Sequence, residues 1–316
     1  MYEKKVTTEN PHLIVILIDQ SSSMSKIFQN VKGKDYSIAH TAKHITDKCL
    51  YEIMRTCASG DEIKPLVDLA IIGYGTSIRS ATPKIPMDQL PFSVKELRNS
   101  YIVKNEIDDS NFDRLLKPRY EWIEEVSNGT TSMMAALKKA KEITEKWITH
   151  HRNSFPPIIL NITDGMPTDD LELVNRFECD SLGDMSTLDL VTTVKEIQKL
   201  ATSDGNVLLC NAHVSPDEQT QILYPINTHI IQNGFAELMF EISSIIPDPL
   251  VALGKQFGLE IQSGSRLFLF NAEVNSLLNL IKFGSSVAMR MSLQDEKTYD
   301  ESDNGGELED KTNSDN

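Results

Sequence analysis

Three oxygen-bearing side chains follow an apolar run near the start of the chain. Residues 13–18 are all apolar, Asp19 comes next, and Ser21 and Ser23 follow at every second position. One carboxylate and two hydroxyls are hard oxygen donors, which suit Mg²⁺, Mn²⁺ or Ca²⁺ better than zinc or copper. Asp-x-Ser-x-Ser alone is a short pattern, so the spacing predicts a divalent cation site only if other segments supply further ligands.

Two such ligands are available downstream. Thr131 lies in residues 128–137, NGTTSMMAAL, where a turn is expected to open a helix, and Asp164 ends a second apolar strand within residues 158–165. The carboxyl ends of parallel strands meet at one edge of a sheet. We therefore expect five side chains to converge at that edge: Asp19, Ser21, Ser23, Thr131 and Asp164.

The elements that carry these residues predict an α/β fold. An apolar run without alternating polar residues indicates a strand buried on both faces, as in the centre of a parallel sheet. Helical periodicity between the runs predicts a doubly wound, mostly parallel central sheet with helices on both faces and one antiparallel edge strand. The expected strands are residues 13–18, 66–75, 77–85 (the antiparallel edge), 158–163, 207–210 and 267–270.

Local signals also predict the ends of several helices. Asp35 is expected to cap a helix that Gly60 ends, and Ser186 with Asp189 forms a capping box at the start of another. The apolar periodicity of residues 131–149 predicts a helix that faces the core.

Several stretches resemble the von Willebrand factor A (VWA) domain. DQSSSMS (19–25), TSMMAAL (131–137) and ITDGMPTDD (162–170) are similar to motifs of bacterial stand-alone VWA proteins of the tellurite-resistance type. DGNVLLCNAHVS (204–215) and SGSRLFLFNAEV (263–274) are similar to bacterial members encoded beside protein kinases and PP2C-type phosphatases. The resemblance extends from residue 13 to about residue 284.

The resemblance implies a Rossmann-like VWA fold with a metal-ion-dependent adhesion site (MIDAS). The implied ion is Mg²⁺ (or Mn²⁺ or Ca²⁺), and it would coordinate an Asp or Glu of a protein partner. A protein of this kind would be a scaffold in a bacterial phosphorylation-linked stress or defence system, with a protein kinase or PP2C-type phosphatase as its candidate partner. The implied ligands are Asp19, Ser21, Ser23, Thr131 and Asp164.

Two departures from the family pattern bear on this site. Ser22 stands where the family has a glycine, and residues 128–130, Asn-Gly-Thr, replace a pair of glycines. The second departure leaves Thr130 as an alternative to Thr131 as the threonine ligand. Thr131 is preferred because it keeps the family spacing to residues 136–137.

Length and motif positions predict one large domain. We expect an N-terminal extension (1–11), a VWA domain (12–284) with insertions at about 92–127 and 216–262, and a disordered acidic tail (285–316). Residues 295–316 hold nine acidic residues against two lysines, and the whole chain has a net charge of −15. This charge argues against nucleic acid and anionic membranes as partners.

The sequence also predicts a cytoplasmic protein without disulfides. No apolar stretch is long enough to span a membrane, and no signal-peptide region precedes the first strand. The four cysteines are scattered without a Cys-x-x-Cys pair, which indicates neither a disulfide framework nor structural zinc, and Cys49 and Cys210 are expected in the core.

Two alternatives to a carboxylate-binding module stay open. The first is a metal-dependent phosphoryl hydrolase, which we do not favour: the turn DQSSSMSK lacks a glycine to cradle phosphate, and Ser21 stands where an aspartyl phosphotransfer enzyme has a second carboxylate. The second is a VWA domain with a structural metal that docks through residues 216–262. We expect no catalytic residues, an exposed and metal-free His40–His44 pair, and a structural role for His213.

Overall fold

The centre of the fold is β1 (His12–Asp19), a strand whose eight residues are all buried. The computed structural model describes residues 1–31, 34–104, 120–179, 183–214, 221–229, 231, 234–256, 258–272, 275–277, 279–280 and 283. Among them an eight-stranded sheet has the order β15-β16-β14-β11-β1-β6-β7, with β8 also paired to β6. Its other strands are β6 (Val67–Tyr74), β7 (Ile78–Ser80), β8 (Phe92–Ser93), β11 (Ile158–Thr163), β14 (Leu208–His213), β15 (Ile222–Leu223) and β16 (Phe268–Phe270).

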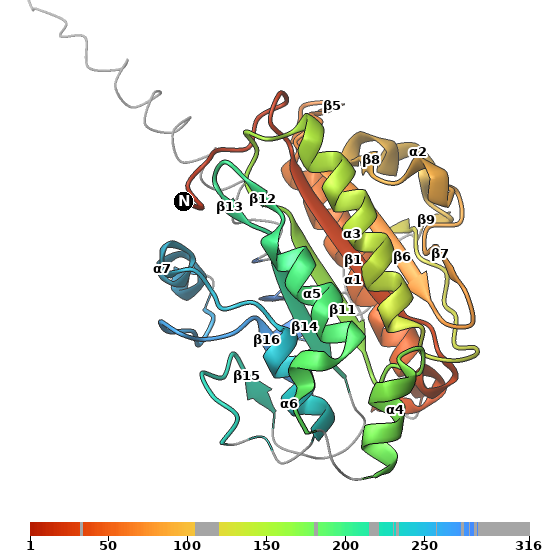
Figure 1. Ribbon diagram of the computed structural model, residues 1–316. Coiled ribbons are helices and arrows are strands. Elements are labelled where there is room, and N and C mark those ends of the chain that lie inside the picture. Colours follow the sequence, from red (N-terminus) through yellow and green to blue (C-terminus); the bar gives the residue numbers. More distant parts are fainter. Residues whose placement is uncertain are drawn as a thin grey trace, which may run out of the picture.

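The two faces of β1 pack on different layers of helices. Ile14, Ile16 and Ile18 belong to one apolar cluster, and Leu13, Val15 and Leu17 belong to the other. The first cluster includes α1 (Ile38–Thr56) and α7 (Asp248–Gln256), and the second includes α3 (Met133–His150), α5 (Asp189–Lys199) and α6 (Gly234–Ile242). Figure 1 shows α3 and α5 in front of the sheet and α1 behind it. The predicted doubly wound sheet with helices on both faces is therefore confirmed.

Both edges of the sheet carry antiparallel strands. β7 pairs antiparallel with β6, as predicted for residues 77–85, although only Ile78–Ser80 form the strand. At the other edge β15 pairs antiparallel with β16, which the sequence did not reveal. The five strands between these edges are parallel, so their carboxyl ends lie on one side.

The remaining elements are short or lie outside the sheet. They are β2 (Ile27–Val31), β3 (Lys34–Ser37), β4 (Ala58–Ser59), β5 (Glu62–Ile63), α2 (Leu97–Ser100), β9 (Val103–Lys104), β10 (Tyr120–Glu121), α4 (Leu171–Glu178), β12 (Ala201–Thr202) and β13 (Gly205–Asn206), with single turns of 3₁₀ helix between some of them. Among the described residues no helix is long and apolar enough to cross a membrane.

The structure corrects the predicted ends of α1. Asp35 lies within β3, and the N-cap is Ser37, whose hydroxyl accepts a hydrogen bond from His40 N at 3.0 Å. The helix ends at Thr56, before Gly60, which has a φ of +61° in the turn between β4 and β5. Ser37 displaces Asp35 as the cap because a short hairpin, β2–β3, occupies the preceding residues.

The predicted capping box of α5 is also wrong. Leu188 is the N-cap and contributes no side-chain hydrogen bond. Leu190 N instead donates to Asp170 Oδ2 at 3.1 Å, while Asp170 Oδ1 accepts from Leu173 N at 3.1 Å and caps α4. One carboxylate from a distant loop thus serves two helix ends, an arrangement that local sequence does not show.

The segments outside the predicted core are described only in part. The backbone nitrogens of Glu3 and Lys4 donate to the Asp204 carboxylate, so the N-terminal extension is attached beside β13. Within the predicted insertion of residues 216–262, α6 and α7 pack on the body of the fold through buried apolar side chains. The predicted acidic tail (285–316) and residues 105–119 of the first insertion lie outside the described residues.

Candidate metal centre

The loop after β1 begins at the point where the strand order reverses. The chain passes from β1 to β6 on one side and later returns to β11 on the other side of β1. In open α/β sheets, ligands bind outside the carboxyl ends of the strands at such a switch point. Asp19 ends β1 and Asp164 follows the last residue of β11, so both carboxylates lie at this position.

Hydrogen bonds hold both oxygens of the buried Asp19 carboxylate. Asp19 Oδ1 accepts from Ser21 N at 2.8 Å, and Oδ2 accepts from the Thr163 hydroxyl at 2.7 Å. Thr163 is the last residue of β11 and is fully buried. Sequence reasoning missed this residue, although a hydroxyl in a buried, mostly apolar strand signals a donor that needs an acceptor.

A chain of three hydrogen-bonded oxygens crosses from this loop to the Asp164 loop. Ser21 Oγ lies 2.9 Å from Ser23 Oγ, and Ser23 Oγ donates to Asp164 Oδ1 at 2.6 Å. Ser21 is buried and Ser23 is half-buried. Four of the five residues expected to converge are therefore joined by hydrogen bonds, from Asp19 to Ser21, from Ser21 to Ser23 and from Ser23 to Asp164.

Ser22 connects this loop to the segment that carries the threonine. Ser22 N donates to Gly129 O at 3.0 Å, and Gly129 N donates to Ser22 Oγ at 2.9 Å. Gly129 has a φ of +87°, and a Cβ there would lie 1.7 Å from Thr76 Oγ1. The hydroxyl of Ser22 thus joins the two loops, and only a glycine fits at 129.

Thr131 joins the site from the side of α3. Thr131 N donates to Thr168 Oγ1 at 3.0 Å, and Thr168 N donates to Thr131 O at 2.9 Å. Thr131 is 6% exposed, whereas the side chain of Thr130 is exposed. No hydrogen bond joins the Thr131 hydroxyl to the other four predicted ligands, all of which the structure describes.

The acidic residues after Asp164 organise the surrounding helices. Asp169 Oδ1 accepts from Met134 N at 3.1 Å, and Oδ2 accepts from Ala135 N at 2.8 Å, so this carboxylate caps α3. Asp169 therefore fixes the helix that follows Thr131 from across the loop. The sequence pattern ITDGMPTDD contains these residues, but it does not reveal which helix end each one reaches.

The two carboxylates are only partly compensated. Burial raises the pKa of Asp19 to about 6, against the hydrogen bonds from Ser21 and Thr163, and the charge of Asp164 adds to the effect. Burial likewise raises the pKa of Asp164, which the Ser23 hydrogen bond and Lys26 oppose. Asp164 Oδ2 is buried without a hydrogen-bond partner. A bound cation would satisfy this oxygen and stabilise both charged carboxylates.

The donor set fits a small, hard cation. Ligands at 2.0–2.1 Å in an octahedron around Mg²⁺ are separated by about 3.0 Å along each edge, whereas Ca²⁺ ligands require about 3.3–3.7 Å. The Ser21 Oγ to Ser23 Oγ distance of 2.9 Å is the length of the hydrogen bond between them, and Mg²⁺ could coordinate both oxygens with little change in this spacing. Among the described residues no cluster of three or more His, Cys, Asp or Glu side chains could hold a metal. The hydroxyl-rich loop is a candidate because of the type and spacing of its oxygen donors.

The histidines singled out by the sequence lie in other surroundings. His40 Nδ1 lies 2.9 Å from Glu125 Oε2, and the rings of His40 and His44 are 4.0 Å apart. Both are half-buried, so the prediction that they are exposed was wrong. Residues 121–125 lie against α1 there: Glu125 contacts His40, and Glu121 pairs with Lys43. His213 is buried at the end of β14, and its ring stacks on Phe270 with centroids 4.5 Å apart, as a packing residue does.

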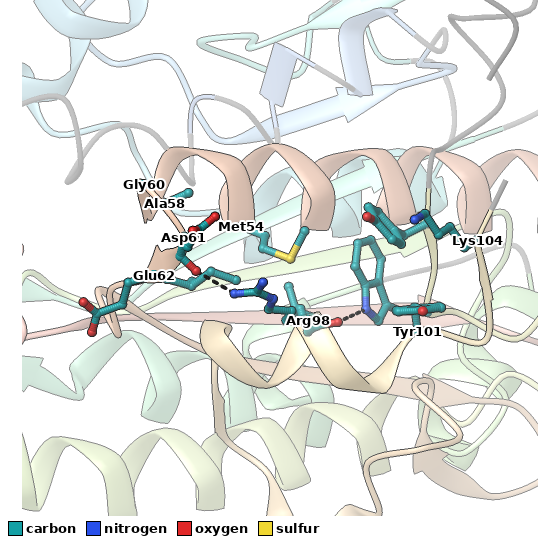
Figure 2. A pocket seen from close by; sticks show the side chains of 12 residues that line it. Met54, Ala58, Gly60, Asp61, Glu62, Arg98, Tyr101 and Lys104 are labelled. Carbon is teal, nitrogen blue, oxygen red and sulfur yellow. Dashed lines mark hydrogen bonds between the residues drawn. The ribbon is translucent and has the colours of Figure 1, made fainter. Parts of the chain in front are cut away.

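A separate hollow lies at the other end of α1. It has a volume of about 340 Å³ and lies between the end of α1, the β4–β5 hairpin and α2. Figure 2 shows the thioether of Met54 and the side chains of Arg98, Tyr101 and Lys104 around it, with Arg98 Nη1 donating to Asp61 O at 2.6 Å. None of the five predicted metal ligands lines it.

No protein-family model and no curated protein matches this sequence. Solved structures that resemble the chain include proximal thread matrix protein 1 from the mussel byssus (11% identity, TM-score 0.45, 90% of this chain and 49% of that one). The PilB minor pilin from Streptococcus sanguinis has 10% identity and a TM-score of 0.43, over 89% of this chain and 62% of that one. The vWF domain of a type V pilus tip protein from Porphyromonas gingivalis has 17% identity and a TM-score of 0.26, over 52% and 40%. This chain thus spans less than two thirds of each of those structures, and likenesses of this size carry no argument about its function.

Proposed function

We propose that this protein is a metal-dependent protein-interaction module of the VWA type. Asp19, Ser21, Ser23, Thr131 and Asp164 would hold Mg²⁺, and the ion would bind a carboxylate of a protein partner. The observation that carries the proposal is the chain of oxygens from Ser21 through Ser23 to Asp164 Oδ1, beside which the second oxygen of that carboxylate, Oδ2, is buried without a hydrogen-bond partner.

The donor types explain why such a site would bind an acid. Serine and threonine hydroxyls are neutral ligands, so they do not cancel the charge of the ion. Asp19 already accepts two hydrogen bonds, and its charge is shared with Ser21 and Thr163. A magnesium ion held in this way remains electrophilic, and an incoming Asp or Glu is its natural additional ligand.

The residue types at the site favour binding over catalysis. A phosphotransfer enzyme with a nucleophilic aspartate has a second carboxylate two residues later, where this chain has Ser21. The hydrolase alternative would have to work without that carboxylate. We therefore propose no catalytic residue.

The identity of the partner is the finer part of the proposal. A scaffold role in a bacterial phosphorylation-linked stress or defence system, with a kinase or PP2C-type phosphatase as partner, is supported by the resemblance of residues 204–215 and 263–274 alone. The cytoplasmic location also stays a prediction, made from the sequence and not from this resemblance. The alternative, a structural metal with docking through residues 216–262, makes the opposite prediction about chelation.

The metal site is tested by calorimetric titration of the full chain with MgCl₂. The wild type should bind Mg²⁺, and Ser23→Ala should lose that binding because Ser23 bridges Ser21 and Asp164. Ser25→Ala is the matched control: it lies in the same loop, is exposed, and donates to Ser22 O at 2.7 Å outside the oxygen chain. It should bind as the wild type does. A wild type without measurable Mg²⁺ binding would overturn the proposal.

A further inference from the structure

The candidate metal centre has one basic neighbour. Lys26 Nζ lies 3.8 Å from Asp164 Oδ2, and no other basic side chain of the described residues pairs with that carboxylate. The backbone fixes Lys26 at the rim of the site, because Lys26 N donates to Ser23 O at 3.1 Å and Lys26 O accepts from Ile38 N at 3.0 Å. The backbone of Lys26 therefore lies directly beside the chain of oxygens.

The two side chains of this ion pair differ in their exposure to solvent. The Lys26 side chain is 59% exposed, whereas the Asp164 side chain is 1% exposed. At 3.8 Å the ammonium is too far for a hydrogen bond, and Asp164 Oδ2 has no other donor. An exposed lysine at this distance gains little from the pair and can swing into water, but the buried carboxylate cannot follow.

We propose that Lys26 is the built-in counter-ion of Asp164 when no divalent cation is bound, and that the cation must displace it. Lys26 thereby sets the affinity of the site for metal. The inference rests on the proposed metal function and adds a residue that is not among the ligands.

Lys26 would lower the affinity for the metal because the ammonium and the ion compete for the Asp164 carboxylate. The ammonium and a divalent ion are both attracted to Asp164, and they repel each other at a separation of a few ångströms. Metal binding therefore includes the loss of the Lys26–Asp164 attraction. Because Lys26 is exposed and screened by salt, we expect it to weaken Mg²⁺ binding by about three- to tenfold rather than to prevent it.

Two measurements, melting temperature and Mg²⁺ affinity, distinguish a counter-ion role of Lys26 from a packing role. Removing a counter-ion leaves Asp164 uncompensated in the metal-free protein, which lowers its melting temperature, but it also removes a competitor, which raises Mg²⁺ affinity. Removing a side chain that only supports the loop would lower both quantities. The two readouts together therefore separate the roles.

The experiment compares four full-length proteins by calorimetric MgCl₂ titration at constant ionic strength and by thermal unfolding in EDTA. They are the wild type, Lys26→Met, Lys26→Arg and Lys141→Met. Lys26→Met should bind Mg²⁺ about three- to tenfold more tightly and melt earlier in EDTA. Lys26→Arg keeps the charge and should bind within about twofold of the wild type. Lys141 Nζ lies 2.7 Å from Glu196 Oε2 between α3 and α5, so Lys141→Met removes the same charge elsewhere and should leave the affinity unchanged.

The outcomes test the counter-ion role of Lys26 separately from the metal site. Tighter binding confined to Lys26→Met supports the counter-ion. If the wild type binds Mg²⁺ and Lys26→Met binds equally or more weakly, or if Lys141→Met gains as much, the inference is overturned while the metal site stands. If neither the wild type nor Lys26→Met binds Mg²⁺, the proposed function fails and takes the inference with it.

Discussion

Asp19 and Asp164 are a pair of buried carboxylates whose charges the surrounding donors satisfy only in part. Without a cation, burial raises the pKa of Asp19 from 3.8 to about 6. The metal-free folded state therefore gains stability from protonation of Asp19, and this contribution is lost as the pH rises from about 4 through about 6. A divalent cation has to displace that proton, so its binding should strengthen over the same range.

Magnesium should consequently stabilise the fold more at about pH 7.5 than at about pH 5. At saturating Mg²⁺ we expect a gain of about 1–3 kcal/mol over EDTA at the higher pH and a clearly smaller one at the lower pH. The measurement is thermal unfolding with Mg²⁺ and with EDTA at both pH values. An equal gain at the two pH values would contradict the participation of Asp19.

The spacing of the two serines also makes a prediction about metal choice. Ser21 Oγ and Ser23 Oγ are 2.9 Å apart, which suits the short ligand distances of Mg²⁺ and Mn²⁺ better than those of Ca²⁺. At equal concentrations, Mg²⁺ and Mn²⁺ should raise the melting temperature more than Ca²⁺ does. A larger shift with Ca²⁺ would show that the loop opens on binding.

His12 adds a pH dependence of the opposite sign far from the metal ligands. It is fully buried at the start of β1, its ring lies 5.2 Å from that of Phe155, and burial lowers its pKa from 6.5 to about 4. The unfolded chain therefore binds the proton more readily, and stability is lost as the pH falls from about 6.5 to about 4. In EDTA, His12→Phe should show a smaller loss of melting temperature between about pH 7 and about pH 5 than the wild type. His150→Phe, at an exposed histidine, is the control and should keep the wild-type slope.

At the scale of the elements, the contact between the β1 loop and the start of α3 depends on Gly129. An alanine there would meet Thr76 Oγ1 at 1.7 Å and would keep a φ of +87°. Gly129→Ala should destabilise the fold by about 1–3 kcal/mol in denaturant unfolding and weaken Mg²⁺ binding, because the Ser22–Gly129 bonds would break.

Gly60→Ala is the matched control for this change. Gly60 also has a positive φ, +61°, but a Cβ there meets nothing within 4 Å. It should show only the backbone part of the cost and leave Mg²⁺ affinity intact. If both variants weaken Mg²⁺ binding equally, the loss reflects general destabilisation and not the loop contact.

Elements that a local sequence pattern determines could be predicted, whereas those that depend on contacts between distant residues could not. The buried runs in β1 and β11 identify central strands because a strand buried on both faces is mostly apolar along its length, and a polar residue such as Asn161 is there hydrogen bonded inside the fold. Asp19, Ser21, Ser23 and Asp164 could therefore be placed together from strand ends alone. The roles of Thr163, Asp169 and Asp170 could not, because each satisfies a backbone or side-chain group that is distant in sequence. The assignment of Asp35 as a cap failed for a local reason: the β2–β3 hairpin occupies the residues before α1.

At the scale of the whole molecule, the sheet order concentrates the candidate ligands at one position. The switch between β11 and β1 brings Asp19 and Asp164 to one edge, and three loops from separate parts of the chain are hydrogen bonded there through Gly129, Thr131 and Thr168. The net charge of −15 is unfavourable for an acidic partner at long range. A divalent ion would offset the two charges of Asp19 and Asp164, so binding of an acidic partner should depend strongly on the metal.

The last prediction concerns that partner. If a partner's Glu coordinates the metal, EDTA, Asp164→Ala and replacement of the contacting Glu by Gln should each weaken the complex, because an amide oxygen is a poorer ligand for a hard cation than a carboxylate. The two substitutions break the same bond, so in a double-mutant cycle their costs should not add. The partner is first isolated by pull-down in Mg²⁺ and in EDTA, and affinities are then measured by calorimetry with Lys141→Met as a charge-changed control away from the site. A complex that survives EDTA undiminished, while substitutions in residues 216–262 abolish it, would replace the adhesion mechanism with docking through that segment and a structural role for the metal.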